Sequence, residues 1–365
     1  MPTNETAYSH GRVPVLGVLL SNLGTPDEPT APAVRRYLAE FLWDRRVVDL
    51  PRPIWWLVLH GIILRLRPAR SARLYRKVWT ESGSPLLAIA RQQRAALQEA
   101  LDALLPGPIR VELGMRYGNP SIGDALGRLV DAGAERILVL PLYPQYSSTT
   151  TASTADAVHA NIRQRHWIPE LRWINDYHMD SGYIAALAGS LRDAWRARPP
   201  ADKLVFSFHG IPERYHLRGD PYPCFCRGTA RAVAELLDLP EQRWTVVFQS
   251  RFGREEWLKP YADETLRELA DAGVGSVDVI CPGFSADCLE TLEEMEQENC
   301  EIFLASGGQS YRYIPALNDR PEHIRALASL VERNVCGWPE ATEDFARAAA
   351  RRESRALALR LGAAD

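Results

Sequence analysis

The segment LVFSFHGIPERY, at residues 204–215, decides the class of fold. It opens with an almost wholly apolar run, and Gly210 and Pro212 then force the chain to turn. An apolar run that does not alternate with polar residues is typical of a strand buried on both faces, as in a parallel sheet. The segment therefore predicts a central strand of an α/β fold, with a loop at its carboxyl end.

Further apolar runs of this kind lie along the chain, at residues 15–20, 111–116, 137–143, 171–174, 245–249, 277–281 and 301–305. Amphipathic segments lie between them, at residues 86–105, 121–131, 182–196, 229–237 and 260–272. Alternation of strands and helices indicates right-handed βαβ units and a doubly wound parallel sheet.

Eight strands exceed one small sheet, so we expect two domains with four strands each. The boundary is expected within residues 175–182, which gives domains at 1–178 and 179–335 and a helical tail at 336–365. An internal similarity supports the division, because ILVLPLYPQYSSTTT at residues 137–151 resembles VDVICPGFSADCLET at residues 277–291.

Composition excludes several classes of protein. The 365 residues are 46% apolar and 24% charged, as in an ordinary globular protein, and the net charge of −3 gives no sign of nucleic-acid binding. The N-terminus lacks the pattern of a secretory signal, so we expect a cytoplasmic protein. The six cysteines include no C-x-x-C pair, which argues against a disulfide framework, and the pair Cys224 and Cys226 is weak support for a metal site.

The loops after the strands carry no phosphate-binding or nucleophile motif: G-x-G-x-x-G, G-x-x-x-x-G-K-[ST] and G-x-S-x-G are all absent. In open α/β sheets the ligand lies beyond the carboxyl ends of the strands. The chemistry is therefore expected from single side chains in these loops. One of them is His209, which follows a buried strand and can accept a proton near neutral pH. The alternative is that it only caps the strand end through a hydrogen bond.

Acidic residues form a second group of candidates in CPGFSADCLETLEE, at residues 281–294. On a helix, Asp287, Glu290 and Glu294 fall within a narrow arc opposite the leucines. Such a row could attract a divalent cation and carry protons away. The alternative is structural, because Asp287 and Glu290 are spaced like an N-cap residue and its capping-box partner.

Two further regions could bind a ligand. Arg45, Arg46 and Arg116, the last followed by Tyr117, can pair with ligand carboxylates, although surface salt bridges are the commoner role of arginine. The apolar segment at 54–66 is too short to span a membrane. It is either an ordinary core helix or an exposed lip that grips a flat ligand or lies on a bilayer surface.

Together these segments resemble the ferrochelatase family over residues 15–335. The motifs that carry the resemblance occur in the family's order: SNLGTPDEPT from Ser21, FLWDRRVVDLP from Phe41, ESGSPL from Glu81, GMRYGNP from Gly114, LPLYPQYSSTTT from Leu140, FSFHGIPERY from Phe206, RGDPYP from Arg218, FQSRFGREEWL from Phe248 and CPGFSADCLETLEE from Cys281. The resemblance implies two Rossmann-like domains with a cleft between them. It also implies insertion of Fe²⁺ into protoporphyrin IX, with release of two protons, to form protohaem.

The resemblance implies roles for particular residues. His209 and Glu290 match the family's catalytic and metal-contacting residues, and Asp287 and Glu294 match its proton or metal relay. The residues matched to porphyrin binding are Leu23, Arg46, Arg116, Tyr117 and Trp257, with 54–66 as the apolar lip at the mouth of the pocket.

Two departures refine the expectation. Ser148 occupies a position where members with a [2Fe–2S] cluster carry a cysteine, and Cys336 is the only cysteine in the C-terminal region. We therefore expect no such cluster and no permanently bound cofactor, with Fe²⁺ as substrate. Leu23 stands where members that use coproporphyrin carry tyrosine, which favours protoporphyrin. The alternatives are a chelatase that inserts cobalt or nickel into a more acidic tetrapyrrole, and a non-catalytic porphyrin or haem carrier.

Overall fold

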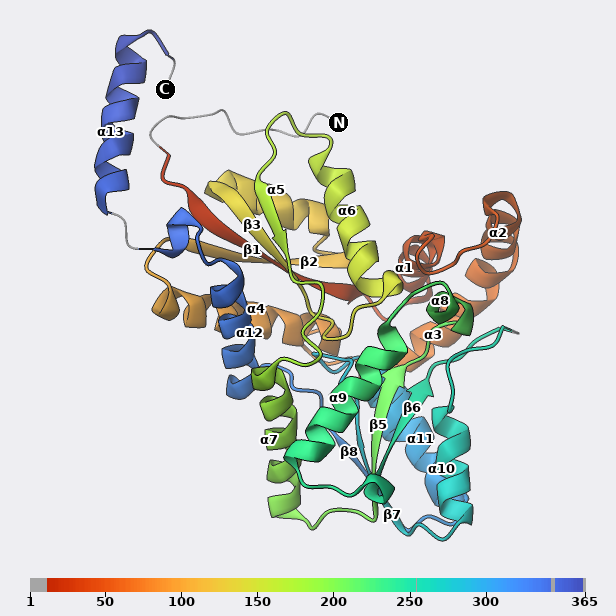
Figure 1. Cartoon of the computed structure of the whole chain (residues 1–365). Helices are drawn as coiled ribbons and strands as arrows, with labels where there is room; N and C mark the ends of the chain where they lie inside the picture. The colour runs from red at the N-terminus through yellow and green to blue at the C-terminus, as the bar shows by residue number, and fades with distance from the viewer. Residues whose placement is uncertain (1–11, 254, 343–344, 364–365) are drawn as a thin grey trace.

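The computed structural model describes residues 12–253, 255–342 and 345–363, with side chains of the last range from residue 350 onward. Two four-stranded parallel sheets form the centres of two halves (Figure 1). The first has the order β2-β1-β3-β4 and the second the order β6-β5-β7-β8. The strands are β1 (Val15–Thr25), β2 (Ile109–Gly118), β3 (Ala134–Pro141), β4 (Glu170–Trp173), β5 (Lys203–His209), β6 (Trp244–Gln249), β7 (Ser276–Ile280) and β8 (Ser310–Ile314). The predicted α/β class, with four strands in each half, is confirmed.

Helices cover both faces of each sheet. In the first half they are α1 (Ala31–Trp43), α2 (Arg52–Val58), η1 (Leu59–Ile63), α3 (Leu64–Val78), α4 (Pro85–Leu104), α5 (Ile122–Ala132), η2 (Ser148–Ala152) and α6 (Ser153–Ile162). From there to the C-terminus they are α7 (Ser181–Ala197), α8 (Glu213–Leu217), α9 (Tyr222–Leu236), η3 (Glu241–Arg243), α10 (Ala262–Asp271), η4 (Glu290–Glu298), α11 (Asn299–Ala305), α12 (Pro321–Asn334), η5 (Pro339–Ala341) and α13 (Phe345–Arg360). Of these, η1, η2 and η4 are π-helices.

One predicted strand is wrong. Residues 301–305 belong to helix α11, which continues η4 without a break, and the eighth strand is Ser310–Ile314. That strand reads SYRYI and lies at the edge of its sheet, where only Ile314 is fully buried. An edge strand does not need a continuous apolar run, so a search for such runs passed over it.

The two halves have the same internal arrangement, as the internal similarity predicted. Each sheet has the same strand order, and a π-helix follows the third strand in each: η2 after β3 and η4 after β7. The largest hydrophobic cluster contains side chains of both sheets, among them Leu20, Leu140, Phe206 and Ile280. A shared core of this kind holds the carboxyl ends of the two sheets in a fixed relation.

The C-terminal segment returns to the first half. Helix α12 packs against α4 and α7, and the Trp338 indole donates a hydrogen bond to Glu170 of β4 at 2.7 Å. Helix α13 then stands apart from the body of the molecule (Figure 1). The division at 178 and 335 puts each sheet in its own domain, and we retain it as a proposal. Within the described residues, no helix has both the length and the apolar character needed to cross a bilayer.

Candidate active site

His209 is the last residue of β5 and lies at the carboxyl end of the second sheet. Its Nδ1 is 2.6 Å from the carbonyl oxygen of Gly210. A carbonyl can only accept, so Nδ1 carries the hydrogen and Nε2 keeps its lone pair. The expected cap at the strand end is therefore present, but it occupies only one ring nitrogen and leaves the other able to take a proton.

Glu294 lies in η4, one turn after Glu290. The Ser250 backbone N–H donates to Glu294 Oε1 at 2.7 Å, and the Ser250 hydroxyl donates to Oε2. Gln249 Nε2 also approaches Oε2, at 3.4 Å. Burial raises the pKa of Glu294 to about 7, and the nearby charge of Glu290 adds to the rise. A carboxyl group with this pKa can accept or release a proton at neutral pH.

Glu290 begins η4 and faces the first half of the molecule. Burial raises the pKa of Tyr37 in α1 and of Tyr75 in α3 well above the usual value, and the negative charge of Glu290 contributes to both shifts. Arg67 in α3 is exposed overall, but desolvation of its guanidinium lowers its pKa, an effect that the charge of Glu290 opposes. The Glu290 carboxylate therefore lies within electrostatic reach of α1 and α3, across the space between the halves.

A chain of aromatic contacts connects Arg67 with His209. The Arg67 guanidinium lies 5.6 Å from the centre of the Phe252 ring, and Phe252 lies 4.8 Å from the Trp257 ring. Trp257 in turn lies 6.5 Å from the His209 ring. These side chains lead from α3 to His209, and the charge of Glu290 in η4 acts on the first of them, Arg67. Of them, Arg67 and Phe252 were missed by the sequence analysis, although Arg67 stands two helical turns before Tyr75 in a strongly basic segment.

Asp287 is held by hydrogen bonds from several elements of the second half. It precedes η4, is 5% exposed, and accepts hydrogen bonds from Tyr313, Thr291, the Ala316 N–H and Asn318. These donors belong to η4, to β8 and to the loop that follows it. The capping box with Glu290 is not formed, because η4 has no side-chain cap at its start. Asp287 thus anchors the start of the helix, and its charge acts with that of Glu294 on the Cys281 thiol.

The predicted porphyrin-binding arginines are already paired within the protein. Arg116 contacts Asp44 at 2.5 Å and Ser153 at 2.6 Å, and the Tyr117 hydroxyl donates to the same Asp44 at 2.9 Å. Hydrogen bonds from the Ser153 hydroxyl and the Arg46 backbone N–H, together with Arg116 and Tyr117, hold the pKa of Asp44 below its usual value despite its burial. Arg46 lies beside this network and pairs with Asp156 at 2.8 Å. Leu23, close by, is partly buried and packs against the cluster that contains Tyr117.

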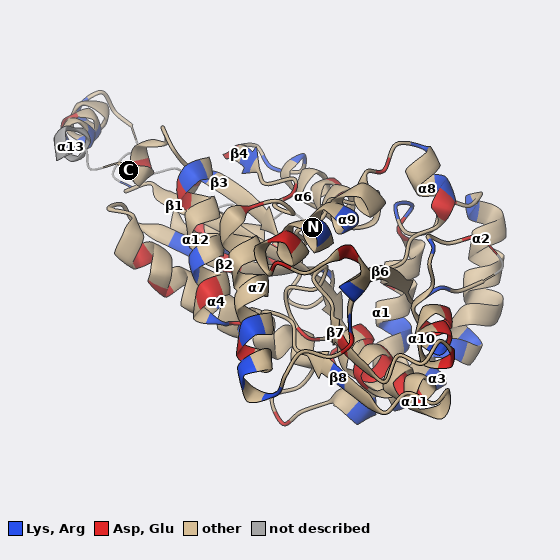
Figure 2. Ribbon diagram, turned by 60° about the horizontal axis from the view of Figure 1, so that its bottom comes forward, with Lys and Arg blue, Asp and Glu red and all other residues tan. Residues whose placement is uncertain are grey.

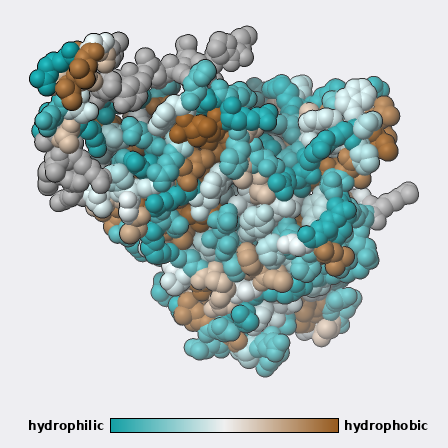
Figure 3. Space-filling view, turned by 45° about the horizontal axis from the view of Figure 1, so that its top comes forward, coloured by the Kyte–Doolittle hydropathy of each residue, from teal (hydrophilic) through white to brown (hydrophobic). Residues whose placement is uncertain are grey.

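The segment 54–66 is partly a core helix and partly an exposed apolar lip. Trp55 is 5% exposed and its indole donates to the Leu42 carbonyl at 2.7 Å, so it belongs to the core. Its neighbours remain exposed: Ile54, Trp56, Leu57, Ile62 and Leu66. Hydrophobic surface accordingly gathers at the right-hand edge of the molecule, where α2 projects (Figure 3). This apolar lip lies on the same helical segment that continues into α3 and carries Arg67.

Basic α3 contacts acidic η4. Lys77 of α3 pairs with the nearly buried Glu293 of η4 at 2.7 Å, which joins the lip-bearing segment to the acid-bearing helix. Figure 2 shows basic and acidic residues close together on the ribbons of α3, α10 and α11. In the described part of the chain, no three His, Cys, Asp or Glu side chains are gathered closely enough to hold a metal ion.

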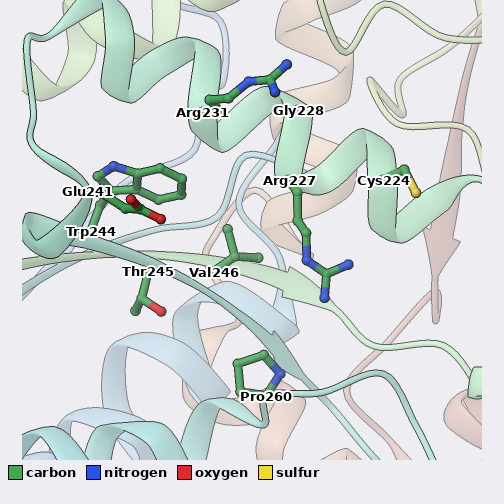
Figure 4. A pocket seen from close by; sticks show the side chains of 9 residues that line it. All are labelled: Cys224, Arg227, Gly228, Arg231, Glu241, Trp244, Thr245, Val246 and Pro260. Atoms are coloured by element: carbon green, nitrogen blue, oxygen red, sulfur yellow. The ribbon is translucent and has the colours of Figure 1, made fainter.

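A cavity of about 560 Å³ lies elsewhere in the molecule. It lies between α9 and the edge strand β6 and is lined mainly by Arg227, Arg231, Trp244, Val246 and Pro260 (Figure 4). Cys224 also lines it, whereas Cys226 is buried, so the two thiols do not share one site. None of the predicted site residues contributes to this cavity.

Replacing Glu294 with glutamine should change how stability depends on pH. The pKa is about 7 in the folded protein against an ordinary 4.5, so the folded state keeps a proton that the unfolded state loses. The stability contributed by this proton is complete below about pH 4.5 and is lost as the pH rises towards 7. Urea unfolding should show that the free energy of unfolding of the variant, relative to that of the wild type, rises by about 2 kcal/mol between pH 5 and pH 8. A difference that does not change with pH would mean that Glu294 titrates normally.

Comparison with known proteins gives one consistent result. The family model described as Ferrochelatase matches residues 15–335. A relative from Thioalkalivibrio sulfidiphilus, named ferrochelatase, is 57% identical over 99% of this chain and 99% of its own length. A second from Nitrosococcus oceani, with the same name, is 57% identical over 96% of this chain and 97% of its own.

Among solved structures, SirB from Bacillus subtilis with Fe³⁺ matches the fold at a TM-score of 0.53 and 14% identity. The match covers 88% of this chain and 96% of that chain, and it supports the two-domain chelatase architecture alone. The family model and the full-length relatives go further than the fold. On their account, this chain belongs to the ferrochelatase family of metal-inserting enzymes.

Proposed function

We propose that the protein inserts Fe²⁺ into protoporphyrin IX and releases two protons, which completes the synthesis of protohaem. One observation supports the proposal at the level of the site: Gln249 pairs in register with His209, and its side-chain amide contacts the Glu290 carbonyl oxygen and Glu294. One shared neighbour thus links the histidine to both glutamates. Each insertion removes two N–H protons from the porphyrin as the metal forms bonds to its nitrogens. His209 takes pyrrole protons through Nε2, and Glu290 with Glu294 passes them on or receives the iron.

Glu294 suits the relay because its pKa of about 7 lets it change protonation state at each turnover. Asp287 supports the relay from behind, by fixing the start of η4 through its four hydrogen bonds. A haem carrier would have no use for a proton acceptor near a partly buried carboxyl group whose pKa is about 7. The site chemistry therefore favours the enzyme over the carrier.

The porphyrin is expected between the lip and the loop that carries Trp257. In the described residues, Arg67 makes no hydrogen bond or ion pair with protein groups, so its guanidinium is available for a propionate. Arg46, Arg116 and Tyr117, being paired already, serve as a wall of the pocket, with Leu23 as an apolar neighbour. The exposed lip supports contact with a membrane surface, and we propose a cytoplasmic location with that peripheral contact.

The proposal is tested by anaerobic incubation with Fe²⁺ and either protoporphyrin IX or coproporphyrin III, following the absorbance change on metalation. We expect a higher kcat/KM for protoporphyrin, because each additional propionate placed against the apolar lip loses hydration without gaining a donor. Replacing Leu23 with tyrosine should raise the relative kcat/KM for coproporphyrin, whereas the Leu23→Phe control, which lacks the hydroxyl, should not. Equal values for the two porphyrins in the wild type would contradict the assignment of substrate, and no metalation of either would contradict the function.

We also propose that iron is only a substrate and that no iron–sulfur cluster is resident. Cys226, Cys281 and Cys288 are buried and form no disulfide. Burial raises the pKa of each of these thiols well above its usual value. A raised pKa disfavours the thiolate form, which is the form that binds a cluster. The anaerobically purified protein should contain no acid-labile sulfide and show no cluster absorption in the visible range. Sulfide in a near one-to-one ratio with iron would refute this.

A further inference from the structure

Gln249 is the last residue of β6 and is 3% exposed. It pairs in register with His209 across the sheet, and its carbonyl oxygen accepts from the Gly210 N–H at 2.7 Å. Gly210 is also the residue whose carbonyl orients the His209 ring. The backbone of Gln249 thus holds the turn that fixes the imidazole.

The side chain of Gln249 reaches the acids. Its Nε2 donates to the Glu290 carbonyl oxygen at 2.9 Å and approaches Glu294 Oε2 at 3.4 Å. Its Oε1 accepts from the Ser207 hydroxyl at 2.7 Å, which determines which end of the amide points at η4. A single buried residue therefore contacts both the strand that carries the base and the helix that carries the acids.

The next residue strengthens the same connection. Ser250 donates through both its backbone N–H and its hydroxyl to Glu294, and it does so with a φ of 67°, in the left-handed region that is costly for a residue with a Cβ. The segment at 249–250 is thus fastened to η4 at Glu290 and at Glu294. No other described residue of β6 reaches η4 through a side-chain hydrogen bond.

We propose that Gln249 is a positioning residue for metal insertion, which sets the distance and orientation of Glu290 and Glu294 relative to His209. It touches neither porphyrin nor iron and acts through these groups. The inference rests on the proposed function of the site. Its consequence is kinetic: a misplaced acid slows proton transfer and insertion but leaves porphyrin binding, which depends on the lip and on Arg67, unchanged.

The test is Gln249→Met, which keeps the length and unbranched shape of the side chain but removes the donor and the acceptor. We expect kcat to fall by about 10- to 100-fold with KM for protoporphyrin within about twofold. Ser207→Ala, which frees the far end of the amide, should give a smaller fall in kcat and the same KM. The matched control is Gln145→Met. Gln145 is also a buried glutamine, and its Nε2 donates to Thr229 at 2.9 Å. This control should lose comparable thermal stability and keep kcat.

A double-mutant cycle with Glu294→Gln gives a readout that a merely structural role would not move. If Gln249 acts through Glu294, the fall in kcat caused by Gln249→Met shrinks in the Glu294→Gln background. The proposal is overturned if the two changes are fully additive, if Gln249→Met keeps kcat, if its defect lies in KM, or if Gln145→Met loses kcat equally. Should Gln249→Met fail to fold, Ser207→Ala alone decides. A wild-type protein without activity would reject the proposed function itself, which is a different result from each of these.

Discussion

Replacing His209 with alanine should slow iron insertion by about 10²- to 10⁴-fold, the range that a positioned general base contributes. The loss should appear in kcat, because the imidazole is engaged only as the pyrrole protons leave. Porphyrin affinity, measured by quenching of protoporphyrin fluorescence, should stay within a fewfold of the wild type. Stability should change little, since among the described residues the ring hydrogen-bonds only to the Gly210 carbonyl.

His216 offers a matched control for this change. Its Nδ1 also bonds to a backbone carbonyl, that of Asp220 at 2.9 Å, but it lies in α8. Alanine at this position should leave kcat near the wild-type value. Near-normal turnover by the His209 variant would remove the proposed proton acceptor, whatever the control does.

The sequence predicted strands best where both faces of the strand are buried. Central strands such as β1 and β5 consist of apolar runs, because helices cover them on each side, and such runs are visible without a structure. Edge strand β8 has no such requirement, and its predicted position was wrong. The helical segment at 301–305 satisfied the same apolar criterion because α11 packs Phe303 into the core.

At the site, the sequence indicated which residues could act, but not which side chains they contact. The position of His209 at a strand end follows from the break after an apolar run. The hydrogen bonds of Asp287 do not, because the donors Tyr313, Ala316 and Asn318 lie 26 to 31 positions further along the chain. Nor does an ideal helix of 3.6 residues per turn show that the acids lie on a π-helix that starts at Glu290. Nor could spacing show that Arg116 is paired with Asp44, 72 positions away in the chain. Such pairings depend on tertiary contacts that leave no local pattern.

Replacing Glu290 with glutamine is the second change expected to have a large effect, about a 10²-fold fall in kcat. The substitution removes the charge but keeps the size of the side chain, and the Gln249 hydrogen bond to the backbone carbonyl of residue 290 can remain. Loss of the charge also removes the group that adds to the pKa shifts of Tyr37 and Tyr75 and of Glu294. The pKa of Glu294 should therefore fall, and the pH profile of the remaining activity should shift towards acid.

The control for Glu290 is Glu296→Gln, on the same π-helix but exposed to solvent. The control removes one negative charge from the same helix. Any general effect of net charge on the attraction of Fe²⁺ would therefore appear in both variants. A fall confined to the Glu290 variant, together with the acid shift of its pH profile, would tie the effect to the space that Glu290 shares with His209. If the two variants lost activity equally, η4 would act only as a diffuse negative surface. If neither did, Glu290 would serve only as the first residue of the helix, and the proton path would have to run through Glu294 alone.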